Sequence, residues 1–222
     1  MNKKFFLSTI ILVLVFTCNI FAEEYKDIPN LAKVKKQVRH YYKKGQWEKD
    51  LDTQYTKADK ILDEYEGDKS KTAIVFDIDE TVLTSFYFLE KIDFAYESFL
   101  PQWASFVLKG DAPAMPRALT FYRKAQKMGF ATFFVTGRPE KYKSISESNL
   151  NAQGFTNYTG IYHRPQTHKK IHSAAEAKTK AREDIESKGY KILLNIGDQE
   201  SDLAGGHAEN TILLPNLIYI VP

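Results

Sequence analysis

The hydrophobic positions at the start of the chain follow a helical pattern. Between about Leu31 and Tyr65 the apolar residues recur at helical spacing, without proline and with Gly45 as the single glycine. This pattern predicts two helices that break near Gly45. Gly67 and the polar residues 68–69 end the pattern, so a different kind of structure is expected to begin there.

Short apolar runs after this point predict the strands of a sheet. They cover residues 72–76, 131–135 and 192–196, with a shorter candidate at 161–162. Helical patterns lie between them, at residues 116–128, 140–153 and 173–188, and each pattern is followed closely by a glycine. Because strands alternate with helices, we expect an α/β fold with a doubly wound, Rossmann-like parallel sheet.

The segment 85–114 interrupts this alternation and is unusually aromatic. It predicts a small helical cap insertion after the first strand. Phe86 and Trp103 are candidates for contacts with a substrate, because aromatic rings stack on flat groups. The alternative is that these rings form the core of the insertion itself.

The first residues have the layout of a secretory signal peptide. Lys3 and Lys4 precede an apolar run over residues 5–16, and Ala22 precedes two glutamates. Cleavage is expected after Ala22, which predicts a periplasmic or secreted protein. An uncleaved membrane anchor is the alternative, but the run is shorter than the roughly 20 residues that span a bilayer. The predicted divisions are a signal peptide (1–22), a helical segment (23–70) and the sheet domain (71–222).

Composition narrows the picture further. The chain has 222 residues, 43% of them hydrophobic and 27% charged, which suffices for one sizeable core. With 31 basic and 28 acidic residues and no basic run, nothing indicates binding to a nucleic-acid polymer. Cys18 is the single cysteine, so the mature chain could not use cysteine catalysis. A lipid anchor at Cys18 is the less favoured alternative, because bulky Phe16 and Val15 lie just before it. The oligomeric state stays open.

Polar clusters follow three of the predicted strands. They cover residues 77–81, 136–138 and 197–202. Each alone could be a helix cap, a turn or a solvated loop. Because ligands bind at the carboxyl ends of strands in open α/β sheets, we expect the three clusters to converge. Acidic residues gathered at one point repel one another unless a cation or phosphate chemistry uses them.

The motifs resemble those of the haloacid dehalogenase (HAD) superfamily. The run Phe-Asp-Ile-Asp-Glu-Thr-Val-Leu at residues 76–83 is similar to its first motif, and Gly-Asp-Gln-Glu-Ser-Asp-Leu at residues 197–203 to its fourth. Within the superfamily the chain resembles the subfamily IIIB acid phosphatases, of the bacterial class B and class C and plant vegetative storage protein types. The resemblance covers roughly residues 77–204. It implies a phosphatase that acts on small phosphate monoesters with Mg²⁺.

The resemblance also implies roles for individual residues. They are Asp77 as nucleophile, Asp79 as general acid and base, Thr136 as phosphate holder, Lys178 as the lysine of the third motif, and Gly137 and Arg138 as substrate contacts. An aspartate nucleophile is chemically reasonable, because a carboxylate can form an acyl phosphate that water then hydrolyses. Residues 178–182, Lys-Thr-Lys-Ala-Arg, resemble the family pattern Lys-Ser-x-Lys-Arg, although Ala181 stands where the pattern has its second lysine. Lys178 is the match, and Lys180 is the reserve.

The expected metal ligands are carboxylates, since Mg²⁺ prefers oxygen and keeps several waters. Asp77 and Asp198 are the candidate side-chain ligands, with the backbone carbonyl of Asp79 as a third. Asp202 is expected near the metal, where it would hold a bound water or the neighbouring lysine.

Three alternatives remain. A binding or storage protein would have kept the fold and lost activity, although intact Asp77 and Asp79 argue against it. A dehalogenase would not need Asp79, because a departing halide requires no proton. A zinc site at His163, His168 and His172 lacks carboxylate or cysteine partners, so these are expected to be surface histidines.

Overall fold

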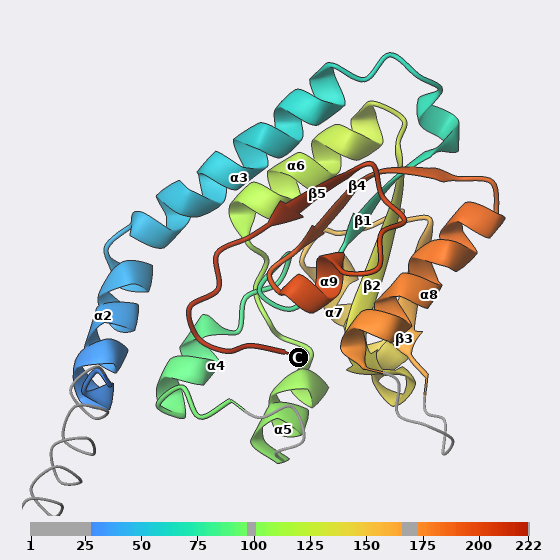
Figure 1. Cartoon of the computed structure of the whole chain (residues 1–222). Coiled ribbons are helices and arrows are strands. Elements are labelled where there is room, and N and C mark those ends of the chain that lie inside the picture. Colours follow the sequence, from blue (N-terminus) through green and yellow to red (C-terminus); the bar gives the residue numbers. More distant parts are fainter. Residues whose placement is uncertain (1–27, 97–100, 166–172, 222) are drawn as a thin grey trace, which may run out of the picture. The chain divides into compact units, whose positions relative to one another are not determined.

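The computed structural model describes residues 28–96, 101–165 and 173–221 (Figure 1). The chain divides into two units, Met1–His40 and Tyr41–Pro222. Helix α2 (Leu31–Lys43) crosses the division, and the sheet lies in the second unit. The predicted signal peptide lies outside the described residues. Within the described ranges, no helix combines the length and the apolar character that a membrane span requires.

The predicted break at Gly45 separates α2 from α3 (Gln46–Asp63). Gly45 has a φ of 81°, a left-handed conformation that glycine adopts without strain. One face of α3 is buried and carries Leu51, Tyr55 and Leu62. A short 3-10 turn, η1 (Lys69–Lys71), then leads into the first strand.

The sheet has five parallel strands in the order β3-β2-β1-β4-β5. Their bounds are β1 (Thr72–Phe76), β2 (Ala131–Pro139), β3 (Gly160–Arg164), β4 (Lys191–Gly197) and β5 (Asn210–Leu213). The connecting helices include α6 (Pro116–Lys127), α7 (Lys143–Ala152), α8 (Ala174–Ser187) and the short α9 (Glu200–Leu203), with the turn η2 (Glu140–Tyr142) before α7. The predicted doubly wound α/β fold is thus confirmed.

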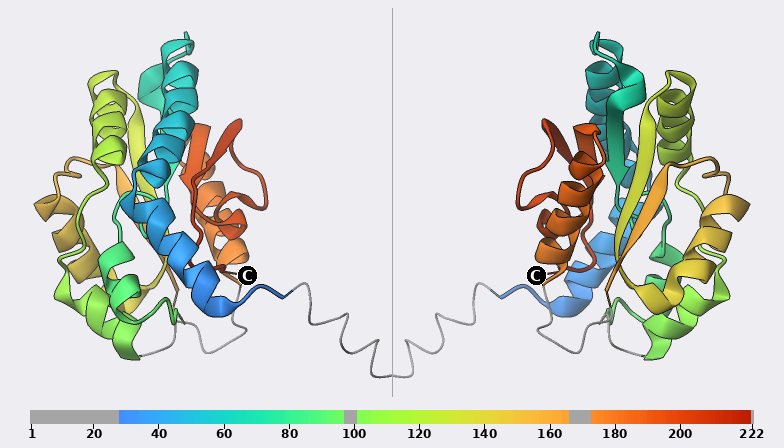
Figure 2. Two further views of the ribbon diagram at one scale, coloured as in Figure 1. Left: turned by 90° about the vertical axis from the view of Figure 1, so that its left-hand side faces the viewer. Right: turned by 90° about the vertical axis from the view of Figure 1, so that its right-hand side faces the viewer.

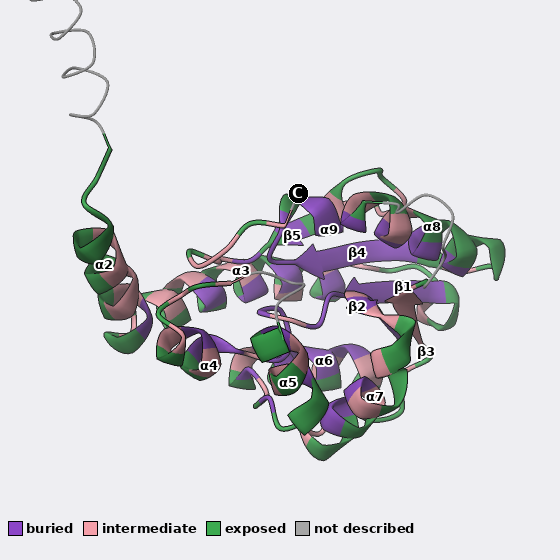
Figure 3. Ribbon diagram, turned by 90° about the horizontal axis from the view of Figure 1, so that it is seen from below, coloured by how far each residue is buried: buried purple, intermediate pink, exposed green. Residues whose placement is uncertain are grey.

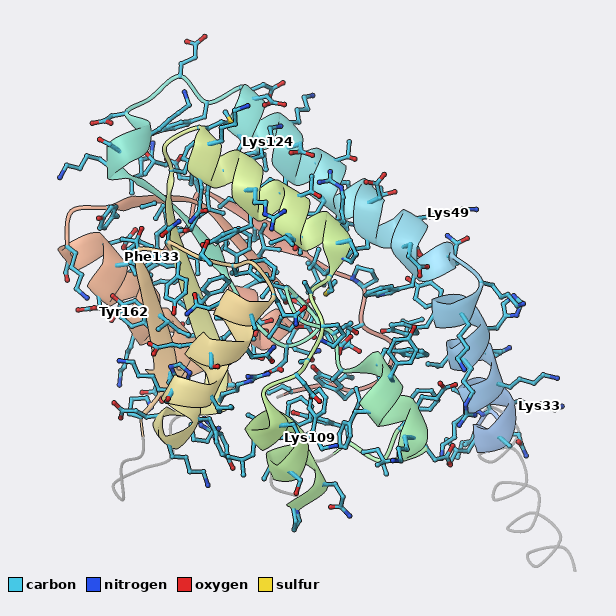
Figure 4. All side chains as sticks on the ribbon, turned by 180° about the vertical axis from the view of Figure 1, so that it is seen from behind. Lys33, Lys49, Lys109, Lys124, Phe133 and Tyr162 are labelled. Atoms are coloured by element: carbon cyan, nitrogen blue, oxygen red, sulfur yellow. The ribbon has the colours of Figure 1, made fainter. Side chains whose placement is uncertain are left out.

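Helices cover both faces of the sheet. Ile74 and Phe76 of β1 belong to a core shared with α3 and α6, whereas Ala73 and Val75 belong to a core shared with α8. Alternate residues of a strand point to opposite faces, which is why β1 is apolar at each position from Ala73 to Phe76. The right-hand view of Figure 2 shows α8 in front of the strands. Figure 3 shows β1 buried along its length and β4 buried after the exposed Lys191. On the α8 face Phe133 packs beside Tyr162 (Figure 4), with ring centroids 6.3 Å apart.

The strand order creates a switch point between β1 and β4. The chain runs from β1 outward to β2 and β3, then returns past β1 to form β4 on its other side. Connections therefore leave the carboxyl ends of β1 and β4 in opposite directions, which opens a crevice between them. The first and the last of the three polar clusters follow these two strands.

The insertion contains α4 (Phe86–Lys91) and α5 (Pro101–Lys109). Its two ends lie together, because Leu83 pairs with Ala114 in an antiparallel bridge. The amide of Thr84 also donates to the carbonyl of Pro113 at 3.0 Å. The insertion is therefore closed at its base and stands over the end of β1.

The structure differs from the sequence prediction at three places. Strand β2 continues to Pro139 instead of ending at Val135, so the second polar cluster lies within the strand. Strand β5 was not predicted, because it has only four residues and is partly exposed. His163 was expected in a surface loop, but it lies in β3 and both ring nitrogens are buried. His168 and His172 lie outside the described residues.

Candidate active site

Asp77 and Asp198 lie side by side at the switch point. Phe76 and Ile196 are partners in the sheet register, and the amide of Asp77 donates to the carbonyl of Ile196 at 2.9 Å. Each aspartate follows the last residues of a buried strand, and both side chains are buried. The predicted convergence of the first and third clusters is thus present in the structure.

Lys178 is the cation of this cluster. Its Nζ donates to Oδ1 of Asp77 and to Oδ1 of Asp202, both at 2.5 Å, from a position on α8 that is only 6% exposed. Lys180, in contrast, is exposed and pairs with Glu176 on its own helix. The geometry therefore favours Lys178 over Lys180 as the lysine of the third motif.

Burial and charge oppose each other at these groups. Burial raises the pKa of Asp77 to about 7, although the neighbouring Lys178 ammonium acts to lower it. Burial would lower the pKa of Lys178, but Asp77 and Asp202 outweigh it and raise that pKa. The pKa of Asp198 is also raised, first by burial and then by the charges of Asp202 and Asp77. An added cation would relieve this repulsion.

Asp202 organises the loop after β4. Its Oδ2 accepts hydrogen bonds from the amides of Asp198 and Gln199, both at 3.0 Å, while Oδ1 accepts from Lys178. Gly197 makes this packing possible, because a Cβ at that position would collide with the Asp202 side chain. Both carboxylate oxygens have protein partners, so Asp202 holds Lys178 and the loop in place beside the other two aspartates.

Three neutral donors hold the Asp198 carboxylate. Thr81 Oγ1 donates to Oδ1 at 3.1 Å, and the side-chain amides of Gln199 and Asn216 donate to Oδ2 at 2.6 and 2.8 Å. Asn216 was not predicted as a site residue. It reaches Asp198 only because the chain folds back after β5, and local sequence gives no sign of that contact.

Asp79 forms a two-point ion pair with Arg138. The Nε and Nη2 atoms of Arg138 donate to the two carboxylate oxygens at 2.9 and 2.6 Å, and Nη1 donates to Ser146 Oγ at 3.1 Å. Arg138 was expected to contact substrate, whereas here it orients Asp79. A guanidinium carries about five N–H donors, so Arg138 retains some for a phosphate as well.

Glu80 connects the first motif to the insertion, a role that the sequence did not reveal. Its backbone has a φ of 55°, and its carboxylate accepts hydrogen bonds from the amide and from the hydroxyl of Ser85, the latter at 2.6 Å. Burial raises the pKa of Glu80 to about 7. The first residue of the insertion is therefore tied to the loop that carries Asp77 and Asp79.

The four aspartates, Lys178 and Arg138 line a pocket of about 390 Å³. Of the predicted site residues, those that line it are Asp77, Asp79, Trp103, Gly137, Arg138, Lys178, Asp198 and Asp202. Two predicted residues are not among the described lining. The hydroxyl of Thr136 accepts from the amide of Arg138 at 3.1 Å, and Phe86 stacks on Tyr42 with ring centroids 4.6 Å apart. Phe86 thus contributes to packing, which agrees with the alternative that rings of the insertion form a core of their own.

The carboxylates are suited to a divalent cation. One carboxylate oxygen from each of Asp77, Asp198 and Asp202 lies within 4.8 Å of the others. Carboxylate oxygens are the donors that hard divalent cations prefer. The donor set therefore fits such a metal at the base of the pocket.

Paired aspartates follow the first strand, and a lysine and two further aspartates lie opposite them, which is the arrangement that the resemblance to the HAD superfamily implies. The model of the HAD superfamily, subfamily IIIB (acid phosphatase), matches residues 12–222. The chain belongs to this family, which confirms the resemblance seen in its motifs.

Relatives agree with this assignment, and a solved structure shares the fold. The chain is 35% identical over 154 residues to the stem 28 kDa glycoprotein of Glycine max, and 32% identical over 158 residues to acid phosphatase 1 of Solanum lycopersicum. These matches cover 68% and 70% of this chain but 61% of either relative. The class C acid phosphatase from Bacillus anthracis has the same fold, with a TM-score of 0.68 and 22% identity over 84% of this chain and 86% of that one.

A substitution of Lys178 tests its place between the buried carboxylates. Without the ammonium, Asp77 and Asp202 would be buried and unpaired, and we expect Lys178→Met to lower the free energy of unfolding by about 3–5 kcal/mol at pH 8. The pKa of Asp77 in the folded chain is about 7, above its unfolded value of about 4. Because Lys178 acts to lower the pKa of Asp77, its removal should raise that pKa further, and the extra destabilisation should grow as the pH rises and Asp77 ionises in the unsubstituted chain.

The loss for Lys178→Met should therefore be smaller at pH 5 than at pH 8, measured by urea unfolding in the presence of EDTA. Lys180→Met is the matched control, because its partner is on the same exposed helix surface, and it should change the free energy by less than about 0.5 kcal/mol. Equal losses for the two variants, or a loss for Lys178→Met that is independent of pH, would contradict this account.

Proposed function

We propose that the protein is an exported, magnesium-dependent acid phosphatase that hydrolyses small phosphate monoesters through a phosphorylated Asp77. The observation that carries the proposal is the placement of Asp77 in the pocket, beside the cation Lys178 and two residues before Asp79. Family membership supports the same activity. Export is proposed from the signal-like residues 1–22 of the sequence.

In the first step, a carboxylate oxygen of Asp77 forms a bond to phosphorus as the bond to the leaving oxygen breaks. Asp79 gives its proton to that oxygen, so the leaving group departs as an alcohol. Lys178 offsets the negative charge of Asp77 and of the phosphoryl group. Arg138 orients Asp79 through both carboxylate oxygens, so one of these two contacts would have to open to leave an oxygen of Asp79 for the proton.

In the second step, water attacks phosphorus and gives a proton to Asp79. The bond between phosphorus and Asp77 breaks, which releases inorganic phosphate and restores both carboxyl groups. Because Asp79 must hold a proton in the first step, we expect faster turnover at acidic than at alkaline pH. Mg²⁺, held by Asp77, Asp198 and the Asp79 carbonyl, would neutralise charge on the phosphoryl oxygens.

Hydrolysis of p-nitrophenyl phosphate by the purified chain tests this proposal. We expect turnover with Mg²⁺ and loss of turnover with EDTA, and Asp77→Asn should lower the rate on the order of 10³-fold or more. Asp184→Asn is a control, since Asp184 lies on the exposed end of α8 and pairs with Lys188. A folded protein without turnover in any condition would instead favour the alternative of a binding or storage protein.

Asn216→Ala tests the proposed metal site through a residue that touches no substrate. Asn216 donates to Asp198 and is not among the residues that line the pocket, and loss of such a partner typically weakens metal binding by about 10- to 100-fold. Mg²⁺ titration followed by calorimetry, without substrate, should show this weakening. Asn210→Ala is the control, because Asn210 donates to the carbonyl of Leu193, away from the carboxylates. Unchanged Mg²⁺ affinity in Asn216→Ala would contradict the assignment of Asp198 as a ligand.

A further inference from the structure

The pocket has one aromatic wall. Tyr96 and Trp103 of the insertion line it together with Tyr219 near the carboxyl end of the chain. The rings of Tyr96 and Tyr219 are stacked with centroids 4.0 Å apart, and Trp103 meets Tyr96 edge-on at 5.2 Å. These contacts hold the rings as one surface, suited to the flat or apolar part of a leaving group.

The wall on the β2 and β3 side carries cations. Arg164 ends β3, and its register partner on β2 is Pro139. Lys141 lies two residues after Pro139, in η2, and both Lys141 and Arg164 line the pocket. Sheet register therefore places the two cations on the same side.

The inner cations of the pocket have carboxylate partners, whereas the outer ones do not. Arg138 pairs with Asp79, and Lys178 with Asp77 and Asp202. Lys141 contacts the ring of Tyr142 at 4.9 Å. Across the parts of the chain that the structure describes, neither Lys141 nor Arg164 forms an ion pair.

No acidic side chain balances these outer charges within the described lining. The acidic residues that line the pocket are the aspartates at its base, Asp77, Asp79, Asp198 and Asp202. The base would accept the phosphate that is cleaved, together with its metal. The outer part is thus left with a net positive charge on one wall and aromatic rings on another.

We propose that Lys141 and Arg164 form a subsite for a second anionic group on the leaving group of the substrate. The preferred substrates would be phosphate monoesters with a flat or apolar body and a second carboxylate or phosphate. This inference rests on the proposed phosphatase activity and adds to it the class of leaving group. Arg164 would donate paired N–H groups to a carboxylate or phosphate, and Lys141 would attract the same anion as a single positive charge.

Matched substrates separate this preference from phosphatase activity itself. The meta- and para-carboxyphenyl phosphates each have a neutral counterpart of similar shape in the corresponding carbamoylphenyl phosphate. We expect kcat/KM for the better carboxylate ester to exceed that for its carbamoyl counterpart on the order of fivefold, because two partly exposed ion pairs contribute modestly. The double variant Lys141→Met/Arg164→Gln should bring this ratio close to one.

Lys143→Met is the matched control. Lys143 is an exposed cation two residues from Lys141 that does not line the pocket, so the variant should keep the ratio of the unsubstituted chain. Equal kcat/KM for both esters in the unsubstituted chain, or a ratio that survives in the double variant, would overturn the subsite. An equal fall of the ratio in Lys143→Met would also overturn it, because the preference would then come from general surface charge. If folded protein hydrolyses p-nitrophenyl phosphate but neither of these esters, the subsite is overturned while the proposed activity stands. If it hydrolyses none of the three, the proposed activity fails as well.

Discussion

The contact between Lys178 and the carboxylates of Asp77 and Asp202 is the interaction on which the rest of the site depends. It joins three elements that are far apart in the sequence: the end of β1, helix α8 and the loop after β4. Several buried carboxylates at one sheet edge would repel one another strongly without a cation. Lys178 offsets part of that charge, and the remaining negative charge would favour a divalent cation at the base of the pocket.

The geometry of the sheet explains why these groups can meet. Parallel strands β1 and β4 end together at the switch point, so two loops of opposite direction share one crevice. Each loop is then held by its own polar contacts, Glu80 with Ser85 in the first and Asp202 with backbone amides in the second. Both loops are thus held in place by hydrogen bonds, which favours precise placement of the carboxylates that they carry.

Much of this arrangement could be predicted from the sequence. Apolar runs followed by acidic clusters located Asp77, Asp79 and Asp198, because a buried strand has a local pattern. Contacts between residues that are far apart in the sequence could not be predicted in the same way. Asn216 reaches Asp198 across the fold, and Tyr219 joins the pocket wall from near the end of the chain.

Two other differences come from side-chain placement. Phe86 is aromatic like Trp103, yet it packs on Tyr42 while Trp103 lines the pocket. The pattern of rings in the insertion cannot separate the two, because both are largely buried. Arg138 was expected to face a substrate, but pairing with Asp79 gives it a second role that only the folded geometry reveals.

The central claim is that the phosphoryl group of the substrate is transferred to Asp77 before water releases it as phosphate. Acid quenching of the protein during turnover, borohydride reduction and peptide mass spectrometry would test it most directly, because borohydride reduces an acyl phosphate and leaves free carboxylates intact. The account predicts that the reduced residue is Asp77 and that it appears only with substrate. Turnover without a reduced residue at Asp77, or with reduction at another aspartate, would contradict it.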